Sequence, residues 1–488
     1  MYRIIYNPVL ICCFIFLLTV ISCVKNDATG NRQLVILSQE EENNIGAREH
    51  PKVIKAFGGV YNNKIVQNYI DSIGKKVALN SELPNIRWTF TILDTPIVNA
   101  FALPGGYIYI TRGLLSLAND EAEVASVLGH EIGHVTARHT AERHAKATFS
   151  NIGLQVLDII VGQPIVSNLA NIGLQGVLSS FSRSQELEAD KLGIRYIRKS
   201  QYDPYGSVRF LKRLDSLVKI SSEDNKNFIN SIFATHPKTL DRAEYTKFLS
   251  DNSSDNKISK NRENYLNAID GMIYGDSSKH GLVKNNQFLH LDLNFTFSVP
   301  EGYSLINKDN AVISHNSDND VVVIFDGMNN EEGITLREII EANIGRSRII
   351  NYEELLINNR LAISVEDKNL VNYNGSKFYR KFFLIKWNEV QVWRFSILIA
   401  PNLKNRYTLE SDSIPKSLNS LSVKEIKLAQ PKYIKILKVE ESDTIELLSK
   451  QMAVLKNKKE LFCLINGLDC NDEDKALING SLIKMIFD

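Results

Sequence analysis

The sequence predicts an α+β protein of several domains: a mainly helical domain with a small β-sheet comes first, a β-rich domain follows, and a small α/β module comes last. The chain has 488 residues, more than one core usually holds, and typical domain lengths give roughly three domains. The strongest local signals are a helix that begins near residue 119 and a series of β-type runs, separated by Asn- and Asp-rich turns, over residues 289–425.

The composition is that of a globular protein. Hydrophobic residues make up 44% of the chain and charged residues 23%, which excludes wholesale disorder and a multi-span membrane protein. The formal net charge is +1, from 57 basic and 56 acidic residues. Because this balance gives no overall attraction to nucleic acid or to an anionic membrane, we expect no nucleic-acid partner.

The N-terminal residues have the pattern of a secretory signal. Arg3 precedes an apolar run at residues 9–21, which is shorter than the roughly 20 residues needed to span a bilayer. The run ends in Val-Ile-Ser-Cys at Cys23, which resembles the lipobox of bacterial lipoproteins, where the Cys is acylated and becomes the first mature residue. We therefore expect a lipid anchor on Cys23 that holds the chain to a membrane of the bacterial cell envelope, facing the periplasm. The alternatives are a short uncleaved membrane anchor or an incidental cysteine.

The remaining cysteines exclude a cysteine-based metal site. Cys12 and Cys13 lie in the expected signal, so Cys463 and Cys470 are left for the mature fold, where they could pair in an oxidising compartment. The sequence has no CxxC motif or Cys/His cluster. Any metal must therefore be held by His and carboxylate side chains.

Three local patterns place secondary structure in the first domain. Ser38 followed by Glu41 has the form of a capping box at a helix start. Residues 87–93 and 107–111 alternate and are rich in β-formers, so we expect a strand in each. Asn119 is expected as the N-cap of a helix with an acidic first turn and apolar residues at helical spacing.

Two further stretches organise the chain. Residues 149–181 contain one charged residue, Asp158, and are interrupted by Gly-Gln-Pro, so we expect a helical hairpin. This hairpin is either core helix or a lid or membrane-touching element beside the site. Residues 250–264 are rich in Ser, Asn, Asp and Lys, which predicts a linker after the first domain.

A candidate zinc site lies on the helix that begins near residue 119. His130 and His134 stand at i and i+4, so both imidazoles project from one helix face, as two tetrahedral zinc ligands require. Glu131 points in an adjacent direction, where it can take a proton from a metal-activated water. Gly129 and Gly133 flank the ligands, and because each costs about 1 kcal/mol relative to Ala, they indicate close approach of another backbone. The alternative is a structural pair of histidines.

The third ligand is expected from residues 182–190. Zinc used for hydrolysis usually has three protein ligands, and this segment offers three carboxylates. Glu186 and Asp190 share one helix face, whereas Glu188 points away. We therefore predict that Glu186 binds the metal and that Asp190 accepts the free N–H of a ligand His, fixing its orientation. Glu188 is expected to be a solvated neighbour.

These residues together resemble a known family. His-Glu-Ile-Gly-His at 130–134, followed by Phe-Ser-Arg-Ser-Gln-Glu-Leu-Glu-Ala-Asp at 181–190, is similar to the gluzincin endopeptidases that include HtpX, BepA and the CAAX prenyl protease. Segments at 29–34, 93–106 and 235–242 fit the same family, and the similarity is greatest to the BepA-like periplasmic members. It covers roughly half of the chain.

The resemblance implies a zinc-dependent endopeptidase that binds one zinc ion per chain through the residues named above. It adds His236, which would either reach the zinc as a latch in the substrate position or stabilise the oxyanion, and Arg242, which could also stabilise the oxyanion. A loop histidine held by local hydrogen bonds is the alternative for His236. His139 and His144 are expected on the exposed continuation of the helix and are excluded.

Polypeptide substrates are expected, because residues 107–111 resemble the edge strand on which such proteases bind an extended peptide. A role in quality control of misfolded envelope proteins would follow. The alternatives are an envelope chaperone or assembly factor with a latched metal site, and a peptidoglycan-binding lipoprotein. The intact Glu131 argues against a dead enzyme.

The last unit resembles a degenerate LysM module, a small fold that often binds peptidoglycan. The resemblance rests on Asp-Thr at 443–444, Leu-Leu at 447–448 and the Asn-Gly pairs at 466–467 and 479–480. A simple structural cap is the alternative. The predicted divisions are a lipoprotein signal peptide at 1–23, a zinc metallopeptidase (zincin) domain at 24–250, a linker at 251–288, a β-rich domain at 289–428 and the LysM-like module at 429–488.

Overall fold

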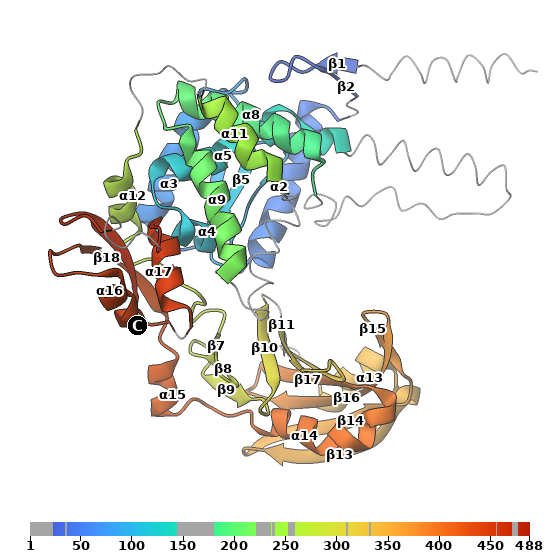
Figure 1. The fold of residues 1–488 in the computed structure, drawn as a ribbon. Helices are drawn as coiled ribbons and strands as arrows, with labels where there is room; N and C mark the ends of the chain where they lie inside the picture. Colours follow the sequence, from blue (N-terminus) through green and yellow to red (C-terminus); the bar gives the residue numbers. More distant parts are fainter. Residues whose placement is uncertain are drawn as a thin grey trace, which may run out of the picture. The chain divides into compact units, whose positions relative to one another are not determined.

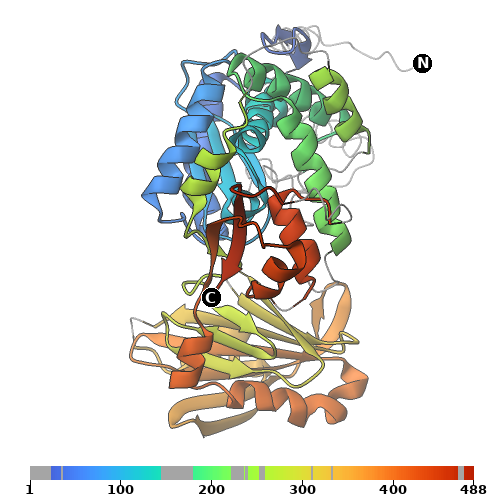
Figure 2. The same cartoon turned by 60° about the vertical axis from the view of Figure 1, so that its left-hand side comes forward.

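The computed structural model is a mixed α/β protein with several sheets, and it divides into two compact units (Figures 1 and 2). The first unit holds residues 1–274 and 433–487, and the second holds residues 275–432. The structure describes residues 23–34, 37–143, 180–220, 236, 240–251, 259–308, 311–330, 333–454, 456–470 and 477–488. The predicted signal peptide up to residue 22 and most of the predicted hairpin, residues 149–179, lie outside the described residues. Within the described part of the chain, no helix is both long and apolar enough to cross a membrane.

The first unit combines a small sheet with a layer of helices. Its elements up to residue 274 are β1 (Cys23–Lys25), β2 (Arg32–Leu34), α2 (Gln39–Ala56), α3 (Lys64–Ala78), β3 (Thr89–Leu93), β4 (Ala100–Leu103), β5 (Tyr107–Thr111), α4 (Arg112–Leu117), α5 (Glu121–Thr136), α8 (Arg183–Lys199), α9 (Tyr205–Ile220), α11 (Leu240–Asp251), α12 (Arg262–Ile269) and β6 (Ile273–Tyr274).

The small sheet has the strand order β3-β5-β4, with β3 parallel and β4 antiparallel to β5. Both strands predicted from alternation are present. The prediction that residues 107–111 form an edge strand is wrong, because β5 is central and pairs with β4 at Phe101↔Tyr109. Alternation reveals a strand but not its neighbours. Within the described sheet, β3 and β4 are the outer strands, and β3 is bridged on its outer side by Val60 at Leu93.

Side-chain capping sets where the helices begin. α2 follows a complete capping box in which Ser38 and Glu41 each bind the other's backbone N–H, as predicted. The N-cap of α5 is Asp120 rather than the predicted Asn119, because Asp120 Oδ1 accepts from the backbone N of Glu123 at 2.8 Å. Asn119 instead donates its own backbone N–H to the Glu123 carboxylate.

Helices α5 and α8 approach each other through glycines. A Cβ on Gly193 of α8 would lie 2.9 Å from the backbone N of His130, and one on Gly133 of α5 would lie 3.0 Å from the carbonyl O of Ala189. Only glycine allows this separation without a shift of the backbone. The predicted close approach of another backbone to Gly133 is confirmed, and the approaching helix carries Glu186.

The last residues form a small α/β module that belongs to the first unit. Its elements are β18 (Lys432–Lys438), α16 (Ile445–Gln451), α17 (Lys458–Asn466) and β19 (Leu482–Phe487). The sheet order is β19-β18-β6, so a strand from before the second unit completes it. Cys463 and Cys470 form the disulfide that the sequence allows.

Residues 262–274 differ from the sequence prediction, which placed them in a linker. They form α12 and β6, and Tyr265, Leu266 and Ile269 are fully buried in the core of the first unit. This short helix contains as many polar as apolar residues, so composition alone does not distinguish it from a linker.

The second unit is mainly antiparallel β-structure. Its main sheet has eight strands in the order β10-β11-β12-β17-β16-β14-β13, with β15 beside β16, and β7-β8-β9 form a smaller sheet. Its elements are β7 (Leu282–Lys284), β8 (Gln287–His290), β9 (Phe295–Ser298), β10 (Tyr303–Lys308), β11 (Ala311–Asn316), β12 (Val321–Asn329), α13 (Leu336–Ile344), β13 (Ile349–Ile357), β14 (Arg360–Asp367), β15 (Val371–Tyr373), β16 (Ser376–Lys386), β17 (Gln391–Ile399), α14 (Lys404–Lys416) and α15 (Val423–Leu428).

A buried lysine ties the C-terminal module to the end of α4. The Lys484 side chain on β19 is fully buried, and its Nζ donates to the carbonyl oxygens of Ser116 at 2.9 Å and Ala118 at 2.6 Å. These are carbonyls that the end of a helix leaves without intrahelical partners. Burial lowers the pKa of the Lys484 amine well below its ordinary value.

We predict that Lys484→Met destabilises the first unit by about 1–3 kcal/mol, because two buried carbonyls lose their donor. A lysine whose folded-state pKa is depressed adds stability that is present above its unfolded pKa and is lost as the pH falls. The deficit of the variant, measured by urea unfolding, should therefore widen between pH 7 and pH 10. Lys438→Met, at an exposed position on the neighbouring strand, is the control. An equal loss in the control would contradict this account.

Candidate metal centre

Four side chains meet at one buried point of the first unit. α5 presents His130 and His134 with their Nε2 atoms 3.0 Å apart, and α8 brings Glu186 to 3.4 Å from His134 Nε2 and 3.5 Å from His130 Nε2. His236 completes the cluster, with its Nδ1 3.1 Å from Glu186 Oε1. One potential ligand atom from each residue lies within 4.8 Å of all the others. The donor set of three imidazoles and one carboxylate suits zinc.

Two carboxylates surround the His130 ring and favour positive charge on it. Its Nδ1 lies 2.8 Å from Asp190 Oδ1, so a neutral ring keeps its proton there and turns the lone pair of Nε2 toward Glu186. Burial alone would lower the pKa of His130, but Asp190 and Glu186 raise it to about 10. The negative charge of these carboxylates would also favour a bound cation, and a metal ion that binds His130 would compete with a proton.

Arg242 of α11 balances the two carboxylates of α8. It bonds Asp190 through Nε at 2.8 Å and Nη2 at 2.7 Å, and its Nη1 lies 2.6 Å from Glu186 Oε2. Burial raises the pKa of the Asp190 carboxyl, but Arg242 and His130 outweigh it and lower the pKa below its ordinary value. Asp190 is therefore ionised and holds the His130 ring in one orientation.

Glu131 lies beside the cluster rather than in it. Its side chain is buried, and its Oε1 lies 3.5 Å from His236 Nε2. Burial raises the pKa of the Glu131 carboxyl above its ordinary value, and the neighbouring His236 and His130 offset only part of this rise. A carboxylate of raised pKa holds a proton more readily, as a general base requires.

The prediction that His139 is exposed and that Glu188 is only a solvated neighbour is wrong. His139 is fully buried, with Nδ1 2.8 Å from His134 Nδ1 and Nε2 3.1 Å from Glu188 Oε2. α5 ends at Thr136, and Arg138 then adopts a left-handed φ of 56°, which turns the chain back under His134. Helix periodicity could not find this contact, because it assumed that the helix continues. His144, which was given the same exposed place, lies outside the described residues.

Phe181 covers the other side of the His134 ring. The two rings stack at 3.7 Å between centroids with an interplanar angle of 19°. Arg143 lies 4.0 Å above the Phe181 ring centroid. Phe181 directly precedes the N-cap of α8, so the segment that leads to Glu186 also packs against the His134 ring of α5.

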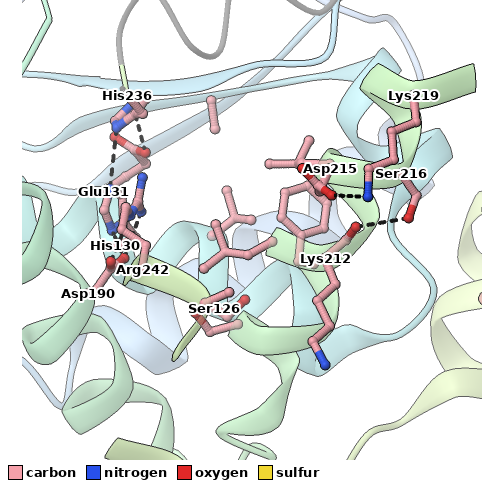
Figure 3. Close-up of a pocket in the computed structure, with 17 residues that line it drawn as sticks. Ser126, His130, Glu131, Asp190, Lys212, Asp215, Ser216, Lys219, His236 and Arg242 are labelled. Atoms are coloured by element: carbon pink, nitrogen blue, oxygen red, sulfur yellow. Dashed lines mark hydrogen bonds and ion pairs between the residues drawn. The ribbon is translucent and has the colours of Figure 1, made fainter. Parts of the chain in front are cut away.

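A cavity of about 400 Å³ opens beside the cluster (Figure 3). His130, Glu131 and His236 lie at one end, and Lys212 and the ion pair between Asp215 and Lys219 lie at the other. The apolar wall between them is formed by Ala100, Val127, Phe210, Leu211 and Leu214. Ala100 belongs to β4, so an outer strand of the sheet borders this cavity. An apolar side chain of a ligand that also reaches the cluster would fit it.

The structure thus brings together seven of the site residues predicted from sequence: His130, Glu131, His134, Glu186, Asp190, His236 and Arg242. Cys23, the predicted lipidation site, lies at the start of β1, where it pairs with Leu34. His139 and Glu188 are the members that the sequence analysis missed.

Comparison with known proteins finds relatives of the region that carries this site. Residues 64–247 match the model of peptidase family M48. The mitochondrial metalloendopeptidase OMA1 of Arabidopsis thaliana is 33% identical over 171 residues, which are 35% of this chain and 33% of that protein. A putative β-barrel assembly-enhancing protease of Vibrio cholerae is 30% identical over 192 residues, or 38% of this chain and 39% of that protein.

A third relative extends further. The mitochondrial metalloendopeptidase OMA1 of Saccharomyces cerevisiae is 30% identical over 221 residues, which are 44% of this chain and 61% of that protein. The chain thus spans between a third and somewhat under two thirds of the length of these curated relatives. The matched segment includes the four side chains of the cluster together with Glu131, Asp190 and Arg242, so the site lies in a region that is similar to peptidase family M48.

Proposed function

We propose that the chain is a zinc-dependent endopeptidase that hydrolyses peptide bonds of polypeptides in the bacterial cell envelope. The observation that carries the proposal is the buried cluster of three imidazoles and one carboxylate, with Glu131 beside it and an apolar cavity next to both. Two of the relatives are named metalloendopeptidases, and a third is named an assembly-enhancing protease. In this proposal His130, His134 and Glu186 hold one zinc ion.

The roles of the chain's own residues follow from their contacts. Zinc, when bound, supplies a Lewis acid that polarises the peptide carbonyl and makes water a better nucleophile. Glu131 accepts the proton of the attacking water and passes it to the leaving amine. Asp190 keeps His130 oriented, and Arg242 keeps Asp190 ionised and offsets the charge of Glu186. Arg242 also lines the cavity, and in this proposal its guanidinium would stabilise the oxyanion as well.

The substrate is proposed to bind as an extended strand along β4. Strand addition to an exposed sheet edge supplies main-chain hydrogen bonds without regard to sequence, and pockets for alternate side chains supply selectivity. β4 is one of the two outer strands of the described sheet, and its Ala100 borders the cavity, whereas the other outer strand, β3, is bridged by Val60. A substrate that pairs with β4 would therefore place one apolar side chain in the cavity beside Glu131.

His236 is proposed to act as a latch. Its Nδ1 lies 3.1 Å from Glu186 Oε1 and 3.3 Å from His130 Nε2, so this imidazole would be available as a fourth ligand beside the three residues that would hold the metal. A fourth protein ligand occupies the position that a hydrolytic site leaves for water and substrate. These contacts also favour a second candidate function, an envelope assembly factor or chaperone whose metal site is mostly closed.

The envelope location rests on the signal-like N-terminus and on Cys23, which would carry the lipid anchor. Residues that follow Cys23 pack against the catalytic helices, so the anchor would hold the peptidase domain near the membrane surface. Quality control of misfolded envelope proteins fits a protease that recognises extended chains. The resemblance of the C-terminal residues to a LysM module rests on their sequence alone, and contact with peptidoglycan through them is a further part of this proposal.

Glu131→Gln should lower the rate at which a denatured model protein is cleaved by at least about 100-fold, because the glutamine side chain cannot accept the proton of water. It should still bind one zinc ion, since Glu131 is not in the ligand cluster. Glu244→Gln, an exposed change on α11, is the matched control and should cleave normally. Retention of more than a tenth of the activity by Glu131→Gln would remove its role as general base.

His236→Ala should raise the cleavage rate and weaken zinc binding, because the change opens one coordination position and removes one donor. Both are measured on one preparation, by proteolysis of the same denatured protein and by chelator competition. A slower rate with unchanged zinc affinity would contradict the latch and favour oxyanion stabilisation by His236.

Leu211→Trp should shift the residues accepted beside the scissile bond from large apolar to small ones, because the indole fills part of the cavity. The cleavage sites are mapped by mass spectrometry of a digested peptide mixture. Val218→Trp, at an exposed position of the same helix, serves as the control. Identical cleavage sites in wild type and Leu211→Trp would show that the cavity does not receive a substrate side chain.

A further inference from the structure

The two histidines of α5 are supported in different ways. The outward nitrogen of His130 faces a carboxylate, Asp190, at 2.8 Å. The outward nitrogen of His134 faces a second imidazole, that of His139, also at 2.8 Å. Beyond His139 stands Glu188, 3.1 Å from the far ring nitrogen. The negative charge that supports His134 therefore lies one side chain further out than the charge that supports His130.

The hydrogen bonds from His134 through His139 to Glu188 can run in only one direction if His134 binds a metal through Nε2. His134 then carries its proton on Nδ1 and donates it to Nδ1 of His139. His139 must carry its own proton on Nε2, which donates to Glu188. Each nitrogen and oxygen along the path has one role, and the Glu188 carboxylate sets the tautomer of both rings.

The N-terminal hairpin completes the path. Asn31, in the turn between β1 and β2, donates its side-chain N–H to Glu188 Oε1 at 3.1 Å. Asn26 and Gln33 donate to the carbonyl oxygens of Thr136 and Ala137 at 3.0 and 2.9 Å. The hairpin therefore caps carbonyls at the end of α5 and at the same time fixes the carboxylate that supports His134.

The turn after α5 depends on contacts as well. Arg138 adopts a left-handed conformation that is unfavourable for residues other than glycine. Its guanidinium holds this conformation by bonding the Glu42 carboxylate at 3.1 Å and the carbonyl oxygen of Leu37 at 2.6 Å. His139 is thus placed by a turn whose geometry the surrounding structure maintains.

We propose that His139 and Glu188 are positioning residues for the zinc ligand His134, and that the hairpin of residues 23–34 completes their support through Asn31. The proposal rests on the zinc site of the proposed function. The proposal implies that the packing of residues 23–34 against α5 and α8 influences the affinity of the site for zinc. His139, Glu188 and Asn31 are not among the residues that line the cavity.

The test measures zinc affinity by chelator competition and ligand geometry by the visible absorption of the cobalt-substituted chain, on the full chain at one pH. We expect His139→Leu to raise the zinc Kd about 10- to 100-fold, Glu188→Gln about 10-fold and Asn31→Ala about 3-fold, and His139→Leu and Glu188→Gln to change the cobalt spectrum. His139→Gln retains an acceptor and a donor in one amide and should recover part of the loss. Asp27→Ala, exposed in the same turn, should match wild type.

Glu188→Gln decides the matter if His139→Leu does not fold, because Glu188 lies at the surface with 26% of its side chain exposed. An unchanged zinc Kd and an unchanged cobalt spectrum in Glu188→Gln would overturn the positioning role while leaving the zinc site intact. Failure of wild type to bind zinc would instead overturn the proposed function, and this inference with it.

Discussion

The close packing of α5 against α8 is the constraint on which the site depends. Gly133 and Gly193 let the two backbones approach until a Cβ would meet the opposite chain. At this separation the two imidazoles of α5 and the Glu186 carboxylate of α8 reach one another without extending into solvent. A Cβ at Gly193 would force the two backbones apart, and one at Gly133 would require its neighbours to shift, so either change would disturb the approach of the ligands.

The close packing of α5 and α8 also buries charged side chains, and neighbouring side chains of opposite charge compensate for them. Three carboxylates, those of Glu131, Glu186 and Asp190, lie within the protein together with the Arg242 guanidinium. A buried charge without a partner would cost several kcal/mol, so each acid has a basic neighbour within 4 Å. A bound cation would supply the remaining positive charge. The supports of His130 and His134 extend this compensation outward, to α11 on one side and to the N-terminal hairpin on the other.

Local patterns predicted much of the fold and most of the site. The HExxH spacing and the shared face of Glu186 and Asp190 depend only on helix geometry, and the structure shows those residues adjacent to one another. His139 was missed because a left-handed residue other than glycine ends the helix, and no sequence signal marks Arg138 for that role. The order of the strands in the sheet could not be predicted either. Alternation of residue types indicated that β5 is a strand, but not that β4 pairs with one side of it.

The central claim is that one zinc ion binds where the four side chains meet, and metal content tests it most directly. The full chain, purified after equilibration with a small excess of zinc and removal of the unbound metal, should contain one zinc ion per chain. Glu186→Ala should contain almost none, because one of the ligands is lost and Arg242, which then keeps only Asp190 as its carboxylate partner, leaves positive charge at the site. A wild-type chain without zinc, or a Glu186→Ala chain with the wild-type content, would contradict the account.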